Sequence, residues 1–424
     1  MQSLPSPESI LVPRFSPFKR LVLASLCCCI AAPAAFAATT ATTTVAVTTA
    51  AARTHLQATV DGAIRPVMAK YGVPGIAVAV TVDGQVLFFN YGVASKASGA
   101  PVNEDTLFEL GSISKTLTAT LACYAQGQGK LSFDEHPSRY MPQLKGSAID
   151  AASVLDLGTY AAGGLPLQFP DQVEDSAQIL AYFRGWKPDA APGMLRQYSN
   201  PSLGLFGHLA GLALKTDFAS AIEQQLLPAL GMEHSYVQVP GSAVKQYAWG
   251  YDSAGKPVRV TPGALDTETY GIKSTAADMI HFLQVNINPG TLAAPFQRAV
   301  ECTHVGYLQV SPAQQLGDMV QGLGWEQYRG NVSLQRLLDG NSEKMIFDPN
   351  PVSRLTPPQP APTGTLFNKT GSTRGFGAYA IFKPEQKIGI VILANKNYPI
   401  PARVTAAYAI LQQLEQGAKA AAAR

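Results

Sequence analysis

A serine followed three residues later by a lysine occurs four times in this 424-residue chain, at Ser16, Ser112, Ser242 and Ser253. Such a pair can do acyl-transfer chemistry, because a deprotonated lysine can activate a serine hydroxyl for attack on a carbonyl carbon. Chance produces this spacing at about the same rate, so the spacing alone selects none of the four. The choice among them depends on their surroundings.

The pair Ser112 and Lys115 has the surroundings that catalysis needs. It follows an apolar run over residues 107–111 and opens a predicted helix over residues 116–124, whereas the other pairs lie in the N-terminal leader or in glycine-containing loops. Residues i and i+3 share a helix face, and a helix N-terminus stabilises negative charge. A buried lysine beside a second cation has a lowered pKa and can act as a base. The competing interpretation is a helix-capping serine followed by a solvated lysine.

Two further motifs favour the catalytic interpretation. Tyr198-Ser199-Asn200 is the only Tyr-x-Asn among 16 tyrosines, and Lys369-Thr370-Gly371 occurs once, on a predicted strand. Taken singly, the first is a loop with a turn-forming asparagine and the second is a strand edge. Taken together, and in this order along the chain, they predict that Ser112 is a nucleophile. A tyrosine between two lysine charges would have a favoured phenolate form.

The elements that must position these motifs lie at both ends of the chain. The patterns predict a helix over 56–71, a hairpin of strands 75–82 and 85–89 around Asp83-Gly84, strands over 365–369, 377–382 and 388–394, and a helix over 401–414. Helical patterns dominate from 112 to about 231. We therefore predict an α/β fold of the α+β type, in which an antiparallel sheet of N- and C-terminal strands is flanked by helices. Residues 53–110 and 260–424 would form this α/β domain, and residues 111–259 a mostly helical domain.

The first 37 residues have the pattern of a secretory signal peptide. A basic segment with Arg14, Lys19 and Arg20 precedes an apolar run over 21–32, and Ala35-Phe36-Ala37 supplies a cleavage site. A membrane anchor or a lipoprotein is less favoured, because Pro33 interrupts the short run and Leu26 stands before the first cysteine. We expect a Thr/Ala-rich mobile start over 38–52 and a mature protein in the periplasm.

Composition excludes several classes of function. Charged residues make up 14% of the chain with a net charge of +3 and no basic block, so nucleic acid is a poor partner. The six histidines are isolated, so we expect no metal site. Of five cysteines, Cys123 and Cys302 lie beyond the leader. Export permits a disulfide between them, and two buried free thiols are an equally good interpretation.

The motifs resemble those of the class C β-lactamases (AmpC-type cephalosporinases), within the larger group of penicillin-recognising serine enzymes with the β-lactamase/transpeptidase-like fold. Class A enzymes are less similar, since they have Ser-Asp-Asn in place of Tyr198-Ser199-Asn200. The resemblance covers roughly residues 55–415. The similar blocks are residues 108–116, 159–168, 198–207, 262–273, 368–371 and 393–399.

The resemblance implies hydrolysis of the β-lactam amide of cephalosporins and penicillins through an acyl-enzyme on Ser112. Lys115 and Tyr198 would activate the Ser112 hydroxyl, and either could be the kinetic base. Tyr198 could also protonate the leaving nitrogen. The backbone N–H groups of Ser112 and Ser372 would form the oxyanion hole. Lys369 would tune Tyr198 electrostatically.

The resemblance also implies a substrate-binding set. Asn200 and Gln168 would hold the amide side chain, while Lys369 and Thr370 would hold the ring carboxylate. Tyr270 would wall the pocket and help to place the deacylating water. Arg403 would add a second positive contact. The full set that we expect to bind substrate is Gln168, Asn200, Tyr270, Thr370, Gly371, Asn397 and Arg403.

Two positions depart from the family pattern. Ile400 stands where many relatives have a carboxylate-contacting asparagine, and Arg374 stands where relatives often have glycine. Arg374 would either alter the cephalosporin range or point into solvent. The competing functions are a D-alanyl-D-alanine carboxypeptidase or an esterase of the same fold, and a penicillin-binding sensor. We expect a monomer whose partners are small β-lactams, with no cofactor and no stable membrane partner.

Overall fold

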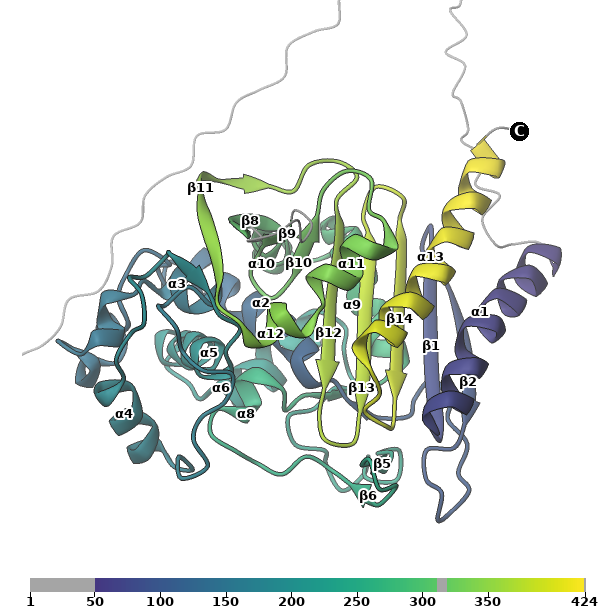
Figure 1. Cartoon of the computed structure of the whole chain (residues 1–424), viewed down its shortest axis with the longest axis horizontal. Helices are drawn as coiled ribbons and strands as arrows, with labels where there is room; N and C mark the ends of the chain where they lie inside the picture. The colour runs from purple at the N-terminus through teal and green to yellow at the C-terminus, as the bar shows by residue number, and fades with distance from the viewer. Residues whose placement is uncertain (1–49, 311–318, 423–424) are drawn as a thin grey trace, which may run out of the picture. The chain divides into compact units, whose positions relative to one another are not determined.

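A computed structural model describes residues 50–310 and 319–422, and within these ranges ten strands form one antiparallel sheet (Figure 1). The strand order is β2-β1-β14-β13-β12-β10-β9-β8-β11-β4. The strands are β1 (Gly75–Val82), β2 (Gln85–Gly92), β4 (Leu195–Arg196), β8 (Val305–Val310), β9 (Met319–Gln321), β10 (Glu326–Tyr328), β11 (Asn350–Pro360), β12 (Leu366–Ser372), β13 (Gly377–Lys383) and β14 (Ile388–Ala394).

The sheet joins the two ends of the chain. β1 pairs with β14 in antiparallel register, with Ile76 opposite Ala394 and Val82 opposite Ile388. β2 returns beside β1 after the Asp83-Gly84 turn, where both residues have positive φ as a tight hairpin requires. The predicted α+β fold, with a sheet built from N- and C-terminal strands, is therefore confirmed.

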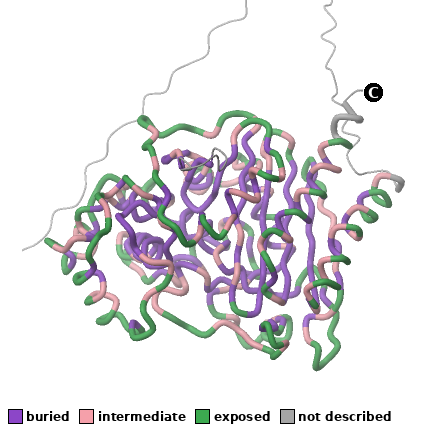
Figure 2. Tube along the Cα trace, viewed as in Figure 1, coloured by how far each residue is buried: buried purple, intermediate pink, exposed green. Residues whose placement is uncertain are grey.

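Alternate residues of the strands face two different layers of helices. Ile76, Val78 and Val80 pack in one core with α1 (Ala50–Tyr71) and α13 (Ile400–Ala422). Ala77 and Ala79 point the other way and pack with α2 (Ser114–Gly127) and α9 (Ala276–Ile287). Successive side chains of a strand point to opposite faces, and a helical layer covers each face, so β1 is buried on both faces. Figure 2 shows the buried positions running along the central strands and the helices packed against them.

A third core holds the helical segment together. It gathers apolar side chains of α2, α3 (Val154–Gly158), α5 (Asn200–Leu214) and α10 (Ala294–Thr303). The division into domains at residues 110 and 260 stays a prediction. The other helices are α4 (Ser176–Gly185), α6 (Phe218–Ala221), α7 (Leu227–Ala229), α8 (Asp266–Thr269), α11 (Leu334–Gly340) and α12 (Glu343–Phe347), and the small strand pairs are β3 (Phe108–Glu109) with β7 (Lys273–Ser274) and β5 (Gly250–Tyr251) with β6 (Pro257–Val258).

The two cysteines that follow the leader form a disulfide. Cys123 on α2 is bonded to Cys302 on α10, across a sequence separation of 179 residues. The interpretation as two free thiols is therefore wrong, because the packing of α10 against α2 brings the two side chains together.

The leader lies outside the described residues. The predicted signal peptide over 1–37 and most of the Thr/Ala-rich start over 38–52 are not described, while α1 begins at Ala50. In the part of the chain that the structure covers, no helix is long and apolar enough to span a membrane.

Candidate active site

Ser112 lies at the start of α2, in a 3-10 turn over Gly111–Ile113 that continues into the helix. Lys115 Nζ donates hydrogen bonds to Ser112 Oγ at 2.9 Å and to the carbonyl oxygen of Thr269 at 2.9 Å. The Lys115 side chain is fully buried. Burial lowers the pKa of Lys115 to about 8, aided by the positive charge of Lys369 and opposed by Tyr198. A lysine with this pKa can hold or release a proton near neutral pH.

Tyr198 faces both lysines from the other side of the pocket. The centre of its ring lies 5.3 Å from Lys115 Nζ and 4.9 Å from Lys369 Nζ. Burial would raise the pKa of Tyr198, but the charges of Lys115 and Lys369 outweigh burial and bring this pKa to about 8. The middle residue of the Tyr-x-Asn motif fixes this position, because Ser199 caps α5 and its Oγ accepts a hydrogen bond from Ser202 N at 3.0 Å.

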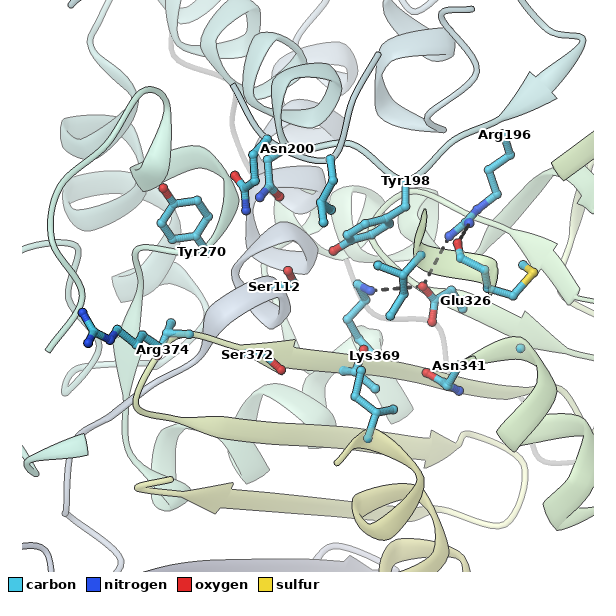
Figure 3. A pocket seen from close by; sticks show the side chains of 18 of the residues that line it. Ser112, Arg196, Tyr198, Asn200, Tyr270, Glu326, Asn341, Lys369, Ser372 and Arg374 are labelled. Atoms are coloured by element: carbon cyan, nitrogen blue, oxygen red, sulfur yellow. Dashed lines mark hydrogen bonds and ion pairs between the residues drawn. The ribbon is translucent and has the colours of Figure 1, made fainter. Parts of the chain in front are cut away.

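Lys369 lies on β12, a central strand of the sheet, and an ion pair holds its buried side chain. Its Nζ donates to Glu326 Oε1 at 3.0 Å, and Arg196 Nη2 lies 3.7 Å from the same oxygen (Figure 3). Burial would lower the pKa of Lys369, but the Glu326 carboxylate outweighs burial and raises it. Lys369 is therefore a fixed positive charge, in contrast to Lys115.

Glu326 and Arg196 line the site and were missed by sequence reasoning. Arg196 donates to Gln321 Oε1 at 2.7 Å and to the carbonyl oxygen of Met345 at 2.8 Å, so its position is rigid. Arg196 stands two residues before Tyr198 in an extended segment, which is a signal that both side chains share a side. Glu326 gives no comparable signal, since its role depends on the pairing of β10 with β12.

Two glycines bring the backbones at Ser112 and Ser372 into contact. Gly111 has φ +53°, and a Cβ there would lie 2.4 Å from Ser372 N. A Cβ at Gly371 would lie 1.9 Å from the carbonyl oxygen of Leu110. Only glycine permits this approach, which holds the backbone of Ser372 against the turn that carries Ser112. The two N–H groups expected to form the oxyanion hole therefore come from neighbouring backbone segments.

A pocket of about 320 Å³ opens above Ser112. Eight of the sequence-predicted site residues line it, together with Ile400 and Arg374. The eight are Ser112, Gln168, Tyr198, Asn200, Tyr270, Lys369, Thr370 and Ser372. The lining residues that sequence reasoning missed are Leu167, Arg196, Val260, Glu326, Gly340, Asn341, Met345, Ile346 and Thr373.

Arg403 and Asn397 are not brought into this lining. Arg403 on α13 is fully buried and donates from Nη1 to the carbonyl oxygen of Gly371 at 2.6 Å and to Ser372 Oγ at 2.9 Å. Its Nη2 donates to Asn397 Oδ1 and to the Tyr398 carbonyl oxygen. Arg403 was expected to contact the substrate directly, but it is buried and instead holds the end of β12 through Gly371 and Ser372.

The donor set of the site does not suit a metal. The charged side chains of its lining are three cations, Arg196, Lys369 and Arg374, and one carboxylate, Glu326. Arg196 and Lys369 both pair with Glu326, which leaves no free carboxylate in the described lining for a metal ion. Within the described residues, no group of three or more His, Cys, Asp or Glu side chains is arranged to hold a metal ion.

Comparison with known proteins agrees with the geometry. The family model for beta-lactamase matches residues 60–415. A β-lactamase of Pseudomonas fluorescens is 50% identical over 363 residues, which cover 86% of this chain and 100% of that protein.

Solved structures of related enzymes are similar to this chain over most of its length. A class C β-lactamase in complex with cefoxitin is 46% identical with a TM-score of 0.81, covering 85% of this chain and 99% of that chain. The D-alanine carboxypeptidase AmpC from Burkholderia cenocepacia is 45% identical with a TM-score of 0.80, covering 85% and 99%. With an intact Ser112–Lys115 pair and these relatives, the chain belongs to the β-lactamase family, as a class C serine enzyme.

Proposed function

We propose that the protein hydrolyses the β-lactam amide of cephalosporins and penicillins through an acyl-enzyme on Ser112. The observation that carries this proposal is the 2.9 Å hydrogen bond between Lys115 Nζ and Ser112 Oγ, made by a lysine whose pKa is lowered to about 8. When Lys115 is neutral, its Nζ can accept the Ser112 proton as Oγ attacks the lactam carbonyl carbon. Tyr198 can take the same role as a phenolate.

Attack produces a tetrahedral oxyanion, which the N–H groups of Ser112 and Ser372 stabilise. Such donors each contribute about 100- to 1,000-fold in rate. Collapse of this intermediate breaks the lactam C–N bond, and Tyr198 delivers the proton to the leaving nitrogen. Water then attacks the ester carbonyl, and the Tyr198–Lys115 pair takes the proton of this water. The pair passes this proton to Ser112 Oγ as the ester C–O bond breaks, which restores the serine hydroxyl.

Two groups of pocket residues would bind two different parts of the substrate. Lys369 stays protonated because Glu326 raises its pKa, so Lys369 and Thr370 can hold the ring carboxylate. Asn200 and Gln168 line the same pocket and would bind the amide of the acyl side chain. The substrate is thereby held with its carbonyl carbon over Ser112.

The proposal is tested by Ser112→Ala, with Ser242→Ala as a matched control from another Ser-x-x-Lys pair. Loss of a serine nucleophile costs roughly 10⁴- to 10⁶-fold in turnover. We expect this loss of cephalosporin hydrolysis for Ser112→Ala and wild-type rates for Ser242→Ala. Retained turnover in a folded Ser112→Ala protein, judged by its thermal transition, would contradict the assignment.

A D-alanine carboxypeptidase is the second candidate, because two solved relatives carry that name, one of them together with the name β-lactamase. The two functions differ in how fast water reaches the acyl-enzyme. Intact-protein mass spectrometry after mixing with a penicillin would distinguish them. A β-lactamase returns to the free mass within seconds, whereas a carboxypeptidase keeps the penicilloyl adduct.

The leader pattern and the Cys123–Cys302 disulfide support export to the periplasm. Disulfides persist in oxidising compartments, which include the bacterial periplasm. We expect a periplasmic protein that begins at Ala38 and has the mass of one chain by light scattering. A leader still present in the periplasmic protein would contradict the cleavage site.

A further inference from the structure

The outer rim of the pocket carries an exposed cation. Arg374 follows β12 by two residues, lines the pocket, and has 75% of its side chain exposed. Figure 3 shows Arg374 and Tyr270 on one side of Ser112, with Glu326 and Asn341 on the other. Arg374 is therefore remote from the Glu326–Lys369 ion pair.

Arg374 differs from the other charged residues of the lining in its exposure and in its ion-pair partner. Among the lining residues that the structure describes, Arg196, Glu326 and Lys369 are at most 5% exposed and form ion pairs with each other. Arg374 has one ion-pair contact, from Nη2 to Asp252 Oδ2 at 3.2 Å. A guanidinium has five N–H donors, so most of its donors are available to a ligand.

Asp252 holds this cation at the rim. Asp252 Oδ1 accepts a hydrogen bond from Lys256 N at 2.9 Å, which fixes the carboxylate within its turn. The second oxygen then faces Arg374. The Asp252 carboxylate is buried and only the Arg374 side of this ion pair is open to water, so an incoming carboxylate can share the guanidinium with Asp252.

The substrate orientation proposed above would direct the acyl side chain toward Arg374. With the ring carboxylate at Lys369 and Thr370 and the lactam carbonyl at Ser112, as proposed above, Asn200 and Tyr270 are left to line the space for the acyl side chain. Tyr270 lies on the same side of Ser112 as Arg374 (Figure 3). A side chain that extends past Tyr270 reaches the rim where Arg374 lies.

We propose that Arg374 is a specificity-determining residue that selects β-lactams whose acyl side chain ends in a carboxylate on a flexible tether. The inference rests on the proposed function, because it uses the substrate orientation given there. Arginine suits this role, since its planar guanidinium binds a carboxylate through two parallel hydrogen bonds.

The test compares two cephalosporins that differ in one group. One has a glutaryl side chain, and the other has the terminal amide of the same chain, which is nearly isosteric and neutral. The measured quantity is the kcat/KM for the glutaryl cephalosporin divided by the kcat/KM for its amide analogue. We expect Arg374→Gln to lower this ratio roughly 3- to 10-fold, mainly through KM, because the contact is exposed and screened by salt. We expect Asp252→Asn to raise the ratio, since it frees the guanidinium.

Lys256→Gln is the matched control, because it removes one positive charge from the Asp252 turn at a residue outside the pocket lining. An unchanged ratio in Arg374→Gln, or an equal fall in Lys256→Gln, would overturn the proposal. Failure of the wild type to hydrolyse the amide-terminated cephalosporin would instead overturn the proposed function. Normal hydrolysis of that substrate by Arg374→Gln keeps the two outcomes separate.

Discussion

The protons on Lys115 and Tyr198 determine how acylation by Ser112 depends on pH. Both pKa values are brought to about 8, from ordinary values of 10.5 and 10.0. Loss of one proton from the pair creates the base, whichever residue keeps the other proton. We therefore expect kcat/KM to fall roughly tenfold per pH unit below about 8 and to level off above it.

Lys369→Gln tests the cause of this acid limb. It removes a charge that lowers the pKa of both Lys115 and Tyr198, so both values rise and the limb moves to higher pH. The position of the limb is the readout, because weaker substrate binding lowers kcat/KM at every pH. Lys387→Gln, at an exposed lysine of the β13–β14 turn, should leave the limb in place. A limb that stays or moves to lower pH in Lys369→Gln would contradict this electrostatic account.

The site residues that could be predicted are those that lie a few residues apart in a motif. Ser112 and Lys115 are three residues apart on one helix, so their contact follows from helix geometry. Glu326 and Lys369 are 43 residues apart, and their ion pair depends on the register of β10 against β12. Arg403 was expected at the substrate, because sequence does not tell on which side of β12 the first turn of α13 packs.

At the scale of elements, the contact between β12 and the Ser112 turn should control the catalytic rate. Gly111→Ala and Gly371→Ala each place a Cβ within 2.4 Å of backbone atoms across this contact. The two segments must move apart, which displaces Ser372 N–H from Ser112. We expect kcat to fall about 100- to 1,000-fold, as for loss of one oxyanion-hole donor, with a smaller change in KM.

Gly84→Ala separates this effect from backbone strain. Gly84 also has positive φ, at +83°, but a Cβ there has nothing within 4 Å. This variant should lose some stability and keep its kcat. Steady-state rates and thermal transitions measured on all three variants decide the matter. A folded Gly111→Ala protein with wild-type kcat would show that the close backbone contact is not needed for the oxyanion hole.

The elements that sequence predicted well are long or have strong turn signals. The hairpin of β1 and β2 follows from Asp83-Gly84 between two apolar runs, and it extends to Gly92 rather than to residue 89. β8, β9, β10 and β11 were missed. β9 and β10 have three residues each, too few to display a period of two, and β11 contains four prolines, which argue against a strand. β9 and β10 pair with each other as a hairpin, and β10 joins the sheet by pairing with β12, which is distant in sequence.

At the scale of the whole molecule, the Cys123–Cys302 disulfide closes a loop that contains almost the entire predicted helical domain. The sequence separation is 179 residues, and for loops of this length the chain-entropy model gives about 5 kcal/mol at most. Measured values for such bridges are about 2–5 kcal/mol. We expect the double variant Cys123→Ser/Cys302→Ser to lose stability within this range.

Activity should respond differently from stability. Ser112 precedes α2 and Cys123 lies in its last turns, so the hydrogen bond of Lys115 to Ser112 does not involve the bridge. The double variant should therefore keep kcat/KM at 25 °C, while its urea midpoint falls. Residues 38–424 made in a reducing cytoplasm should match the double variant, and the exported protein should match it only after reduction. If the exported protein and the double variant unfold at the same urea concentration, α2 and α10 are held by packing and the bridge does not constrain the unfolded chain.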